Sequence, residues 1–211
     1  MTTFEHAMLG INGALAAGLH HRHSWKIAAL AGVAAASPDW DGLPIIFSQS
    51  AFATAHRLWG HNGMACVLVG LTLAICDYRF DLVTRAGRAL GKIFRFDITD
   101  ATLALRTTFT PTELWTWIFV AILASLTQLP VDMVISGTAT LGDWELRPFW
   151  PFWNEGWVFP MVRWGDVGIT LIFIAGMFAL LRWPSRLQFI AGITLASVFL
   201  YVVVRGLLAV G

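Results

Sequence analysis

Two carboxylates and two imidazoles lie close together in one short part of the sequence. The stretch from Ala36 to Asn62 contains Asp39, Asp41, His56 and His61. Carboxylate oxygens and imidazole nitrogens are the ligands that borderline divalent cations such as Zn²⁺ take. Such an ion can activate water or polarise a phosphoryl or carbonyl oxygen. The stretch therefore predicts a metal site, and the alternative is a loop of polar side chains without an ion.

The local sequence limits how these side chains can be arranged. Pro38 disfavours helical geometry in the residue before it, so a helix is expected to end there and residues 39 to 41 are expected to be extended. In an extended segment, residues two apart face the same side. His56 and His61 are five residues apart, which does not match one helix face. Gly60 predicts that His56 lies in a turn and that His61 begins the next helix.

The composition shows where such a site would lie. The 211 residues are 57% hydrophobic and 13% charged, and the mean hydropathy is +0.67, which is typical of an integral membrane protein. Residues 1–8 carry no Lys or Arg before the first apolar run, so we expect no cleaved signal peptide. The net charge of +1 and the lack of a nucleic-acid-binding motif argue against a nucleic-acid partner.

Apolar runs that could form membrane helices recur along the whole chain. Because a membrane-spanning helix needs about 20 apolar residues, we predict an all-α, multi-pass helical bundle with about six spans, folded as a single domain over residues 1–211. No internal repeat or linker divides the chain. The predicted runs cover residues 4–19, 26–36, 61–76, 110–136, 166–181 and 187–210.

Two segments between these runs differ from them in character. In residues 79–96 the basic side chains recur at intervals of three and four, opposite the apolar ones, which predicts a basic amphipathic helix lying on an anionic leaflet. Residues 137–165 contain five tryptophans and three phenylalanines, a composition typical of the membrane interface. We expect the first segment to be cytoplasmic and the second to form an outer loop.

The fourth run adds another candidate residue. Thr110 and Glu113 form a predicted capping box around Pro111, so a long helix is expected from there to about Ser136. Asp132 lies in the last third of this helix. An ionisable group inside a membrane helix is a functional candidate by default, and the alternative is that it caps or snorkels at the helix end.

The distribution of basic residues provides an independent test of this arrangement. If the six runs alternate across the membrane, ten Lys and Arg residues fall on one side and four on the other. The richer side is then the cytoplasm, which places both termini outside the inner membrane. The candidate residues come from three separate regions of the chain, yet all fall near the outer face: His6, Asp39, Asp41, His56, His61 and Asp132.

These residues also resemble a known family. His6 followed by Gly10, then residues 37–41 (SPDWD), then residues 56–61 (HRLWGH), resemble the bacterial family of membrane-bound predicted metal-dependent hydrolases that includes LexA-regulated inner-membrane members. The family pattern is a Pro-Asp-x-Asp followed by a His-Arg-x-x-x-His, and the match covers roughly residues 3 to 151. The resemblance implies metal-dependent hydrolysis but names no substrate.

The sequence departs from the family pattern at two positions. Gln128 stands where the family usually has a histidine, four residues before Asp132, and this replaces an imidazole by a weaker amide oxygen. Leu58 stands where glycine is common after the arginine. The first departure bears directly on the number of strong metal ligands.

Together these observations predict a membrane-bound hydrolase with a divalent cofactor, Zn²⁺ first and Mn²⁺ or Mg²⁺ next. Asp41 is the predicted base that accepts a proton from water, and Arg57 is predicted to contact a phosphoryl oxygen or, alternatively, to pair with Asp39 or Asp41. The expected partners are membrane lipid and an amphiphilic, possibly phosphate-ester, substrate. A structural metal site and an ion or solute transporter are the alternatives, although no inverted repeat is evident. The predicted metal ligands are His6, Asp39, His56, His61 and Asp132.

Overall fold

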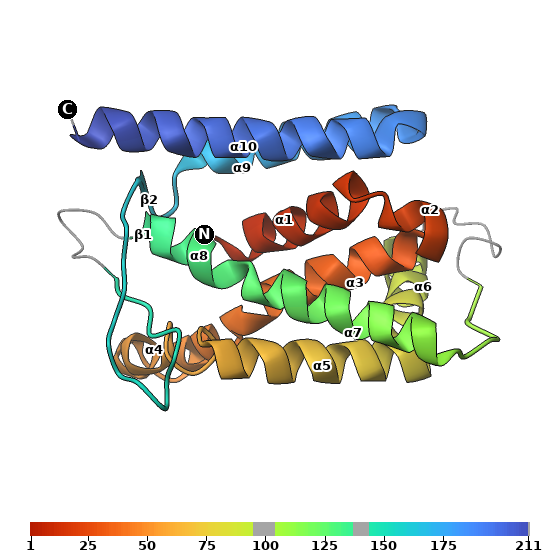
Figure 1. The fold of residues 1–211 in the computed structure, drawn as a ribbon, viewed down its shortest axis with the longest axis horizontal. Coiled ribbons are helices and arrows are strands. Elements are labelled where there is room, and N and C mark those ends of the chain that lie inside the picture. Colours follow the sequence, from red (N-terminus) through yellow and green to blue (C-terminus); the bar gives the residue numbers. More distant parts are fainter. Residues whose placement is uncertain (95–103, 137–143, 211) are drawn as a thin grey trace.

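The computed structural model describes residues 1–94, 104–136 and 144–210. Most of its helices run along one common direction, and the segments that join them gather at the two ends (Figure 1). This arrangement confirms the prediction of an all-α, membrane-type bundle. What the fold contributes to the candidate site is the way it brings distant segments to one of these ends.

The first three helices form a tightly packed part of the bundle. They are α1 (Thr3–Ala16), α2 (Leu19–His23) and α3 (Trp25–Ala36). α1 and α3 approach each other at Gly10, where an added Cβ would lie 2.3 Å from the carbonyl oxygen of Ala31. Small residues permit such close approach of helices within a membrane. The close packing fixes the position of α1, which carries His6.

A second pair of helices packs alongside the first group: α5 (Gly63–Phe80) and α7 (Pro111–Leu126). The Thr110 side chain accepts a hydrogen bond from the Glu113 backbone N–H, as the capping motif predicts. The predicted long helix is present as one apolar segment, Pro111–Val134, but it is interrupted at Thr127, where α7 ends at Leu126 and α8 (Gln128–Val134) begins. Pro130 has no N–H to donate to the carbonyl of Leu126, which accounts for the break one turn earlier.

The chain beyond α8 forms a small sheet and a final helical pair. β1 (Ile135–Ser136) pairs in parallel with β2 (Val162–Arg163). The helices α9 (Val167–Arg182) and α10 (Leu187–Val210) follow, joined by a short 3₁₀ turn, η2 (Pro184–Arg186). The strand pair ties the end of α8 to the segment before α9. Residues 137–143 of the predicted outer loop lie outside the described residues.

Three helical segments of the described chain are long and apolar enough to cross a membrane: Gly63–Phe80, Pro111–Val134 and Pro184–Leu208. Val167–Arg182 is a shorter apolar helix. α1 and α3 have 14 and 12 residues, fewer than the roughly 20 needed to span a bilayer. The membrane character is thus confirmed, and the number of six spans stays a prediction.

The two ends of the bundle carry different residues. Figure 1 shows the N-terminus, α4 (Gln49–Ala55), α8 and the two strands at one end, with α2 and α6 (Leu82–Phe94) at the other. α6 is the predicted amphipathic helix, although it begins at Leu82, after α5 ends at Phe80. Residues 95 and 96 of the prediction lie outside the described part. Candidate site residues therefore gather at the end opposite to the basic helix.

Candidate metal centre

Asp39 and Asp41 lie in a 3₁₀ helix, η1 (Ser37–Ile46), and the expected extended geometry was wrong. Pro38 falls in the first turn of η1, where its fixed φ is tolerated and no N–H is needed. A 3₁₀ helix has about three residues per turn, so side chains two apart point in different directions. As a result, the two aspartates approach the same histidine from different sides.

The histidine loop is folded directly onto η1. His56 ends α4 in an extended conformation, and Arg57 adopts a left-handed one (φ 65°), which confirms the predicted turn. A Cβ at Gly60 would lie 2.0 Å from the Pro38 carbonyl oxygen, so only glycine permits this contact. Asn62 then caps α5 by accepting a hydrogen bond from the Ala65 N–H. These features hold His61 just before α5.

The Asp41 carboxylate joins both histidines of the loop. Its Oδ1 lies 2.9 Å from Nδ1 of His56, and its Oδ2 lies 2.9 Å from Nδ1 of His61 and from the Gly60 N–H. Burial by itself raises the pKa of the Asp41 carboxyl, but these hydrogen bonds outweigh it and lower the pKa to about 2. Because an ionised carboxylate only accepts hydrogen bonds, each ring donates its Nδ1–H to Asp41, and the Nε2 atom of each ring faces away from Asp41.

The Nε2 atom of His61 lies where carboxylates from two other elements meet. It is 3.3 Å from Oδ1 of Asp39 and 3.3 Å from Oδ2 of Asp132 in α8. Burial alone would lower the pKa of His61, but the three surrounding aspartates raise it well above its usual value. The position therefore favours a positive charge, which either a proton or a metal ion can supply.

His6 and Gln128 complete the surroundings of this position. His6 is fully buried on α1, and its Nε2 lies 3.2 Å from Oδ1 of Asp132, which the amino group of Met1 also contacts. The Nε2 of Gln128 lies 2.6 Å from Oδ1 of Asp39 and 2.8 Å from Nε2 of His61. Within the described residues, neither His6 Nδ1 nor Gln128 Oε1 has a hydrogen-bond partner, although both are buried. Buried orphan polar atoms of this kind require an explanation.

Some of these donor atoms are spaced as the ligands of one metal ion are. Ligands placed tetrahedrally at about 2.0 to 2.2 Å from an ion are about 3.3 to 3.6 Å from one another. Nε2 of His6 lies 3.2 Å from Oδ1 of Asp132, and Nε2 of His61 lies 3.3 Å from Oδ2 of Asp132 and 3.3 Å from Oδ1 of Asp39, which are close to these values. One donor atom from each of His6, Asp39 and Asp132 lies within 4.8 Å of the other two. Residues predicted from separate regions of the sequence are thus brought together.

His56 occupies a different place from the other predicted ligands. One ligand atom from each of Asp41, His56 and His61 forms a second group within 4.8 Å. The His56 ring stacks on Phe52 at 4.6 Å and contacts Trp144 at 5.0 Å between ring centroids. Phe52 was not among the predicted site residues, although its position four residues before His56 is a detectable signal. The ring is therefore held by an aspartate on one side and by aromatic side chains on others.

Arg57 anchors the outer loop to the strand end. Its Nη1 donates to Oγ of Ser136 at 3.0 Å and to the carbonyl oxygen of Trp144 at 2.6 Å, and its Cζ lies 4.8 Å from the centre of the Trp144 ring. Ion pairs between Arg57 and Asp39 or Asp41 are not among the contacts of the described residues. Its positive charge still acts on the aspartates of the site. The predicted phosphoryl contact stays untested.

Comparison with known proteins identifies the family. Residues 1–210 match the family described as YdjM inner membrane protein. The chain belongs to the YdjM inner membrane protein family. Neither the curated proteins nor the solved structures that were compared with it gave a match. The name of the YdjM family states a location, the inner membrane, in agreement with the predicted localisation, and it states no reaction.

Proposed function

We propose that this YdjM family member is a membrane-embedded, metal-dependent hydrolase. The observation that carries the proposal is the position of His61 Nε2, buried and 3.3 Å from carboxylate oxygens of both Asp39 and Asp132. Three groups that each offer a lone pair converge there, and a divalent cation placed between them would be stabilised by all three. His6 would be the fourth ligand. When bound, a divalent ion would lower the pKa of water and polarise a phosphoryl or carbonyl oxygen.

The donor set bears on which ion is bound. Two imidazoles and two carboxylates suit Zn²⁺, which commonly takes four ligands of these types. Gln128 now donates its N–H groups to Asp39 and His61. If the side-chain amide of Gln128 is flipped, its Oε1 faces the proposed ion and adds an oxygen ligand. An additional oxygen favours Mn²⁺ or Mg²⁺ more than a histidine there would.

His56 is suited to proton transfer, and Asp41 is suited to holding it. All three hydrogen bonds to Asp41 come from N–H donors, and its low pKa makes it a weak base. The His56 side chain is 12% exposed, compared with 1% for His61, so it can exchange protons with water. We infer that His56 accepts a proton at Nε2 while Asp41 holds the ring and stabilises the imidazolium. In this scheme Asp41 acts as a positioning residue for both histidines.

The substrate is proposed from the location of the site. The centre lies at the end of helices that can cross a membrane, beneath a segment rich in aromatic residues. Aromatic side chains are enriched at the level of lipid headgroups. An amphiphilic phosphate ester would present its headgroup at this depth, where the positive charge of Arg57 already acts on the aspartates. We therefore propose lipid or lipid-like phosphate esters as substrates.

The test is hydrolysis by the purified protein in lipid nanodiscs. Chelation should abolish release of phosphate or headgroup from a panel of lipid phosphate esters, and adding back Zn²⁺ or Mn²⁺ should restore it. The His21→Ala variant is a matched control, since His21 is an exposed histidine at the opposite end of the bundle. Full metal occupancy without hydrolysis across the panel would contradict the enzymatic proposal and favour a structural metal site.

A further inference from the structure

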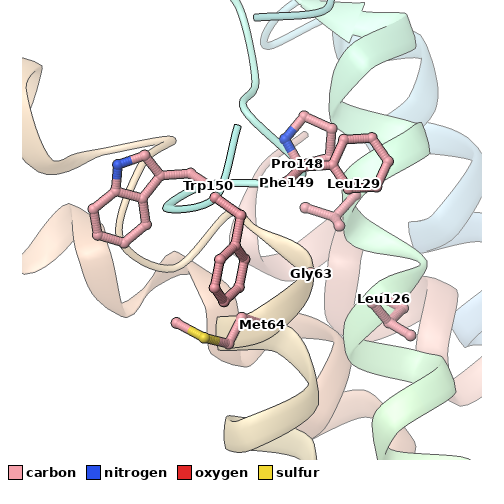
Figure 2. A pocket seen from close by; sticks show the side chains of 8 residues that line it. Gly63, Met64, Leu126, Leu129, Pro148, Phe149 and Trp150 are labelled. Atoms are coloured by element: carbon pink, nitrogen blue, oxygen red, sulfur yellow. The ribbon is translucent and has the colours of Figure 1, made fainter. Parts of the chain in front are cut away.

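An apolar groove lies next to the proposed metal centre. It has a volume of about 460 Å³, which is within the range of ligand sites in proteins. Figure 2 shows it between the start of α5, the junction of α7 and α8, and the segment around Pro148. Each residue of its lining is apolar or glycine: Gly63, Met64, Leu126, Leu129, Pro148, Phe149, Trp150 and Phe152.

The groove is lined by residues that lie next to metal-centre residues in the chain. Leu129 follows Gln128, and Gly63 comes two residues after His61. Consecutive Cα atoms are about 3.8 Å apart, so the groove begins within one or two residues of side chains that face the proposed ion. The Gly63 N–H donates to the Pro148 carbonyl oxygen at 2.7 Å, which fixes the loop wall against the start of α5. The groove and the metal centre are therefore formed by neighbouring residues at the start of α5 and in α8.

The groove is continuous with the surface that faces lipid. Two of its walls are the ends of segments able to span a membrane, Gly63–Phe80 and Pro111–Val134. Its floor is buried, with Leu129 only 7% exposed, whereas its rim is open, with Phe152 86% exposed. Below it on the same two helices, large apolar side chains such as Leu68 and Leu123 are exposed. A hydrocarbon chain from the surrounding bilayer can enter without crossing a polar barrier.

We propose that this groove seats an acyl chain of the substrate, so that the substrate is a lipid whose phosphate headgroup reaches the metal centre. This inference rests on the proposed function. Bilayer hydrocarbon is as apolar as the groove, so the groove gives a bilayer lipid its orientation and adds little affinity. For a substrate taken from water, each buried methylene adds a factor of about four in affinity. The groove therefore determines which amphiphiles are positioned for reaction.

The location of the chain can be measured independently of hydrolysis. Protein in nanodiscs of phosphatidylethanolamine and phosphatidylglycerol is exposed to phosphatidylglycerol that carries a diazirine in one acyl chain, and labelled peptides are mapped by mass spectrometry. We expect labelling concentrated on residues 63–64, 126–129 and 148–152. Met64→Trp, on the groove rim, should reduce it about tenfold, whereas Leu171→Trp, on an exposed position of α9, should not. Equal labelling of all lipid-facing helices would overturn the proposal.

A second measurement tests the link to the reaction. With monomeric phosphate esters of increasing chain length, kcat/KM of the wild type should rise about fourfold per methylene. Met64→Trp should flatten this dependence without loss of bound metal, whereas Leu171→Trp, outside the groove, should keep the wild-type slope. An unchanged slope in Met64→Trp would contradict the proposal. If no ester is hydrolysed, the proposed function fails, and the labelling pattern, repeated in His61→Ala, still decides whether the groove holds a chain.

Discussion

Asp41 Oδ2 lies 2.9 Å from Nδ1 of His61, on the side of the imidazole ring opposite to the nitrogen that faces Asp39 and Asp132. A carboxylate in this position fixes the tautomer and orientation of a metal-binding histidine. The same carboxylate binds His56 through its other oxygen. One buried aspartate thus supports both the ring proposed to bind the ion and the ring proposed to move a proton.

Replacing Asp41 by Asn should weaken both stability and metal binding. The pKa of Asp41 is lowered from 3.8 to about 2, which corresponds to about 2 kcal/mol of stability. Because the folded-state pKa is lowered, this contribution is present above pH 4 and is lost as the pH falls toward about 2. Asp41→Asn should therefore lower the unfolding temperature at neutral pH and reduce metal affinity about 10- to 100-fold. Calorimetry and metal titration measure the two effects.

The roles of the two loop histidines should separate on mutation. His56→Ala should keep the bound metal, since the proposed ligands remain, and should lower turnover about 10²- to 10⁴-fold through loss of proton transfer. Metal analysis and kinetics on the same preparation test this division. If His56→Ala loses the metal as completely as His61→Ala does, then His56 is itself a ligand, as the sequence analysis predicted.

Metal affinity should increase with pH. The pKa of His61 is raised well above its usual value by the surrounding aspartates, so a proton competes with the ion for Nε2. Below this pKa, affinity should rise about tenfold per pH unit, and it should level off above it. In the metal-free protein, the stability that this proton provides is lost as pH rises through the raised pKa. Titrations from pH 6 to 9 should show the slope in wild type, and a flat profile would contradict it.

The contact between the histidine loop and η1 can be tested by comparing two glycine substitutions. In Gly60→Ala the new Cβ would lie 2.0 Å from the Pro38 carbonyl oxygen, so the loop must move away from η1. We expect loss of metal and a stability decrease of about 2 to 4 kcal/mol. Gly13→Ala is the control, because no atom lies within 4 Å of its added Cβ. Equal effects of the two substitutions would disprove the importance of this contact.

Some of this arrangement is contained in the local sequence, and some of it depends on tertiary contacts. The cap at Thr110, the turn at His56 and the amphipathic helix after Asp81 follow from residue type and spacing, and the structure confirms them. The 3₁₀ geometry of residues 39–41 was not predicted, because Pro38 is compatible both with an extended chain and with the first turn of a helix.

The individual roles of the polar side chains could not be predicted from the sequence and depend on the structure. The sequence placed six candidates near one face, but it does not specify which nitrogen of His61 faces which aspartate. Asp41 was predicted to act as a base, and only the three N–H donors around it indicate a positioning role. Arg57 donates hydrogen bonds to Ser136 and Trp144, which lie about eighty residues further along the chain. No local sequence pattern connects these two residues to Arg57.

The metal content of the purified protein tests the central claim most directly. Wild type, His61→Ala and the control His21→Ala are purified in parallel at neutral pH, and bound metals are measured by mass spectrometry. The proposed centre predicts near-stoichiometric Zn²⁺ or Mn²⁺ in wild type and His21→Ala, and its loss in His61→Ala while the fold is retained. Wild-type protein that binds no divalent metal, even after incubation with Zn²⁺ and Mn²⁺, would contradict the account.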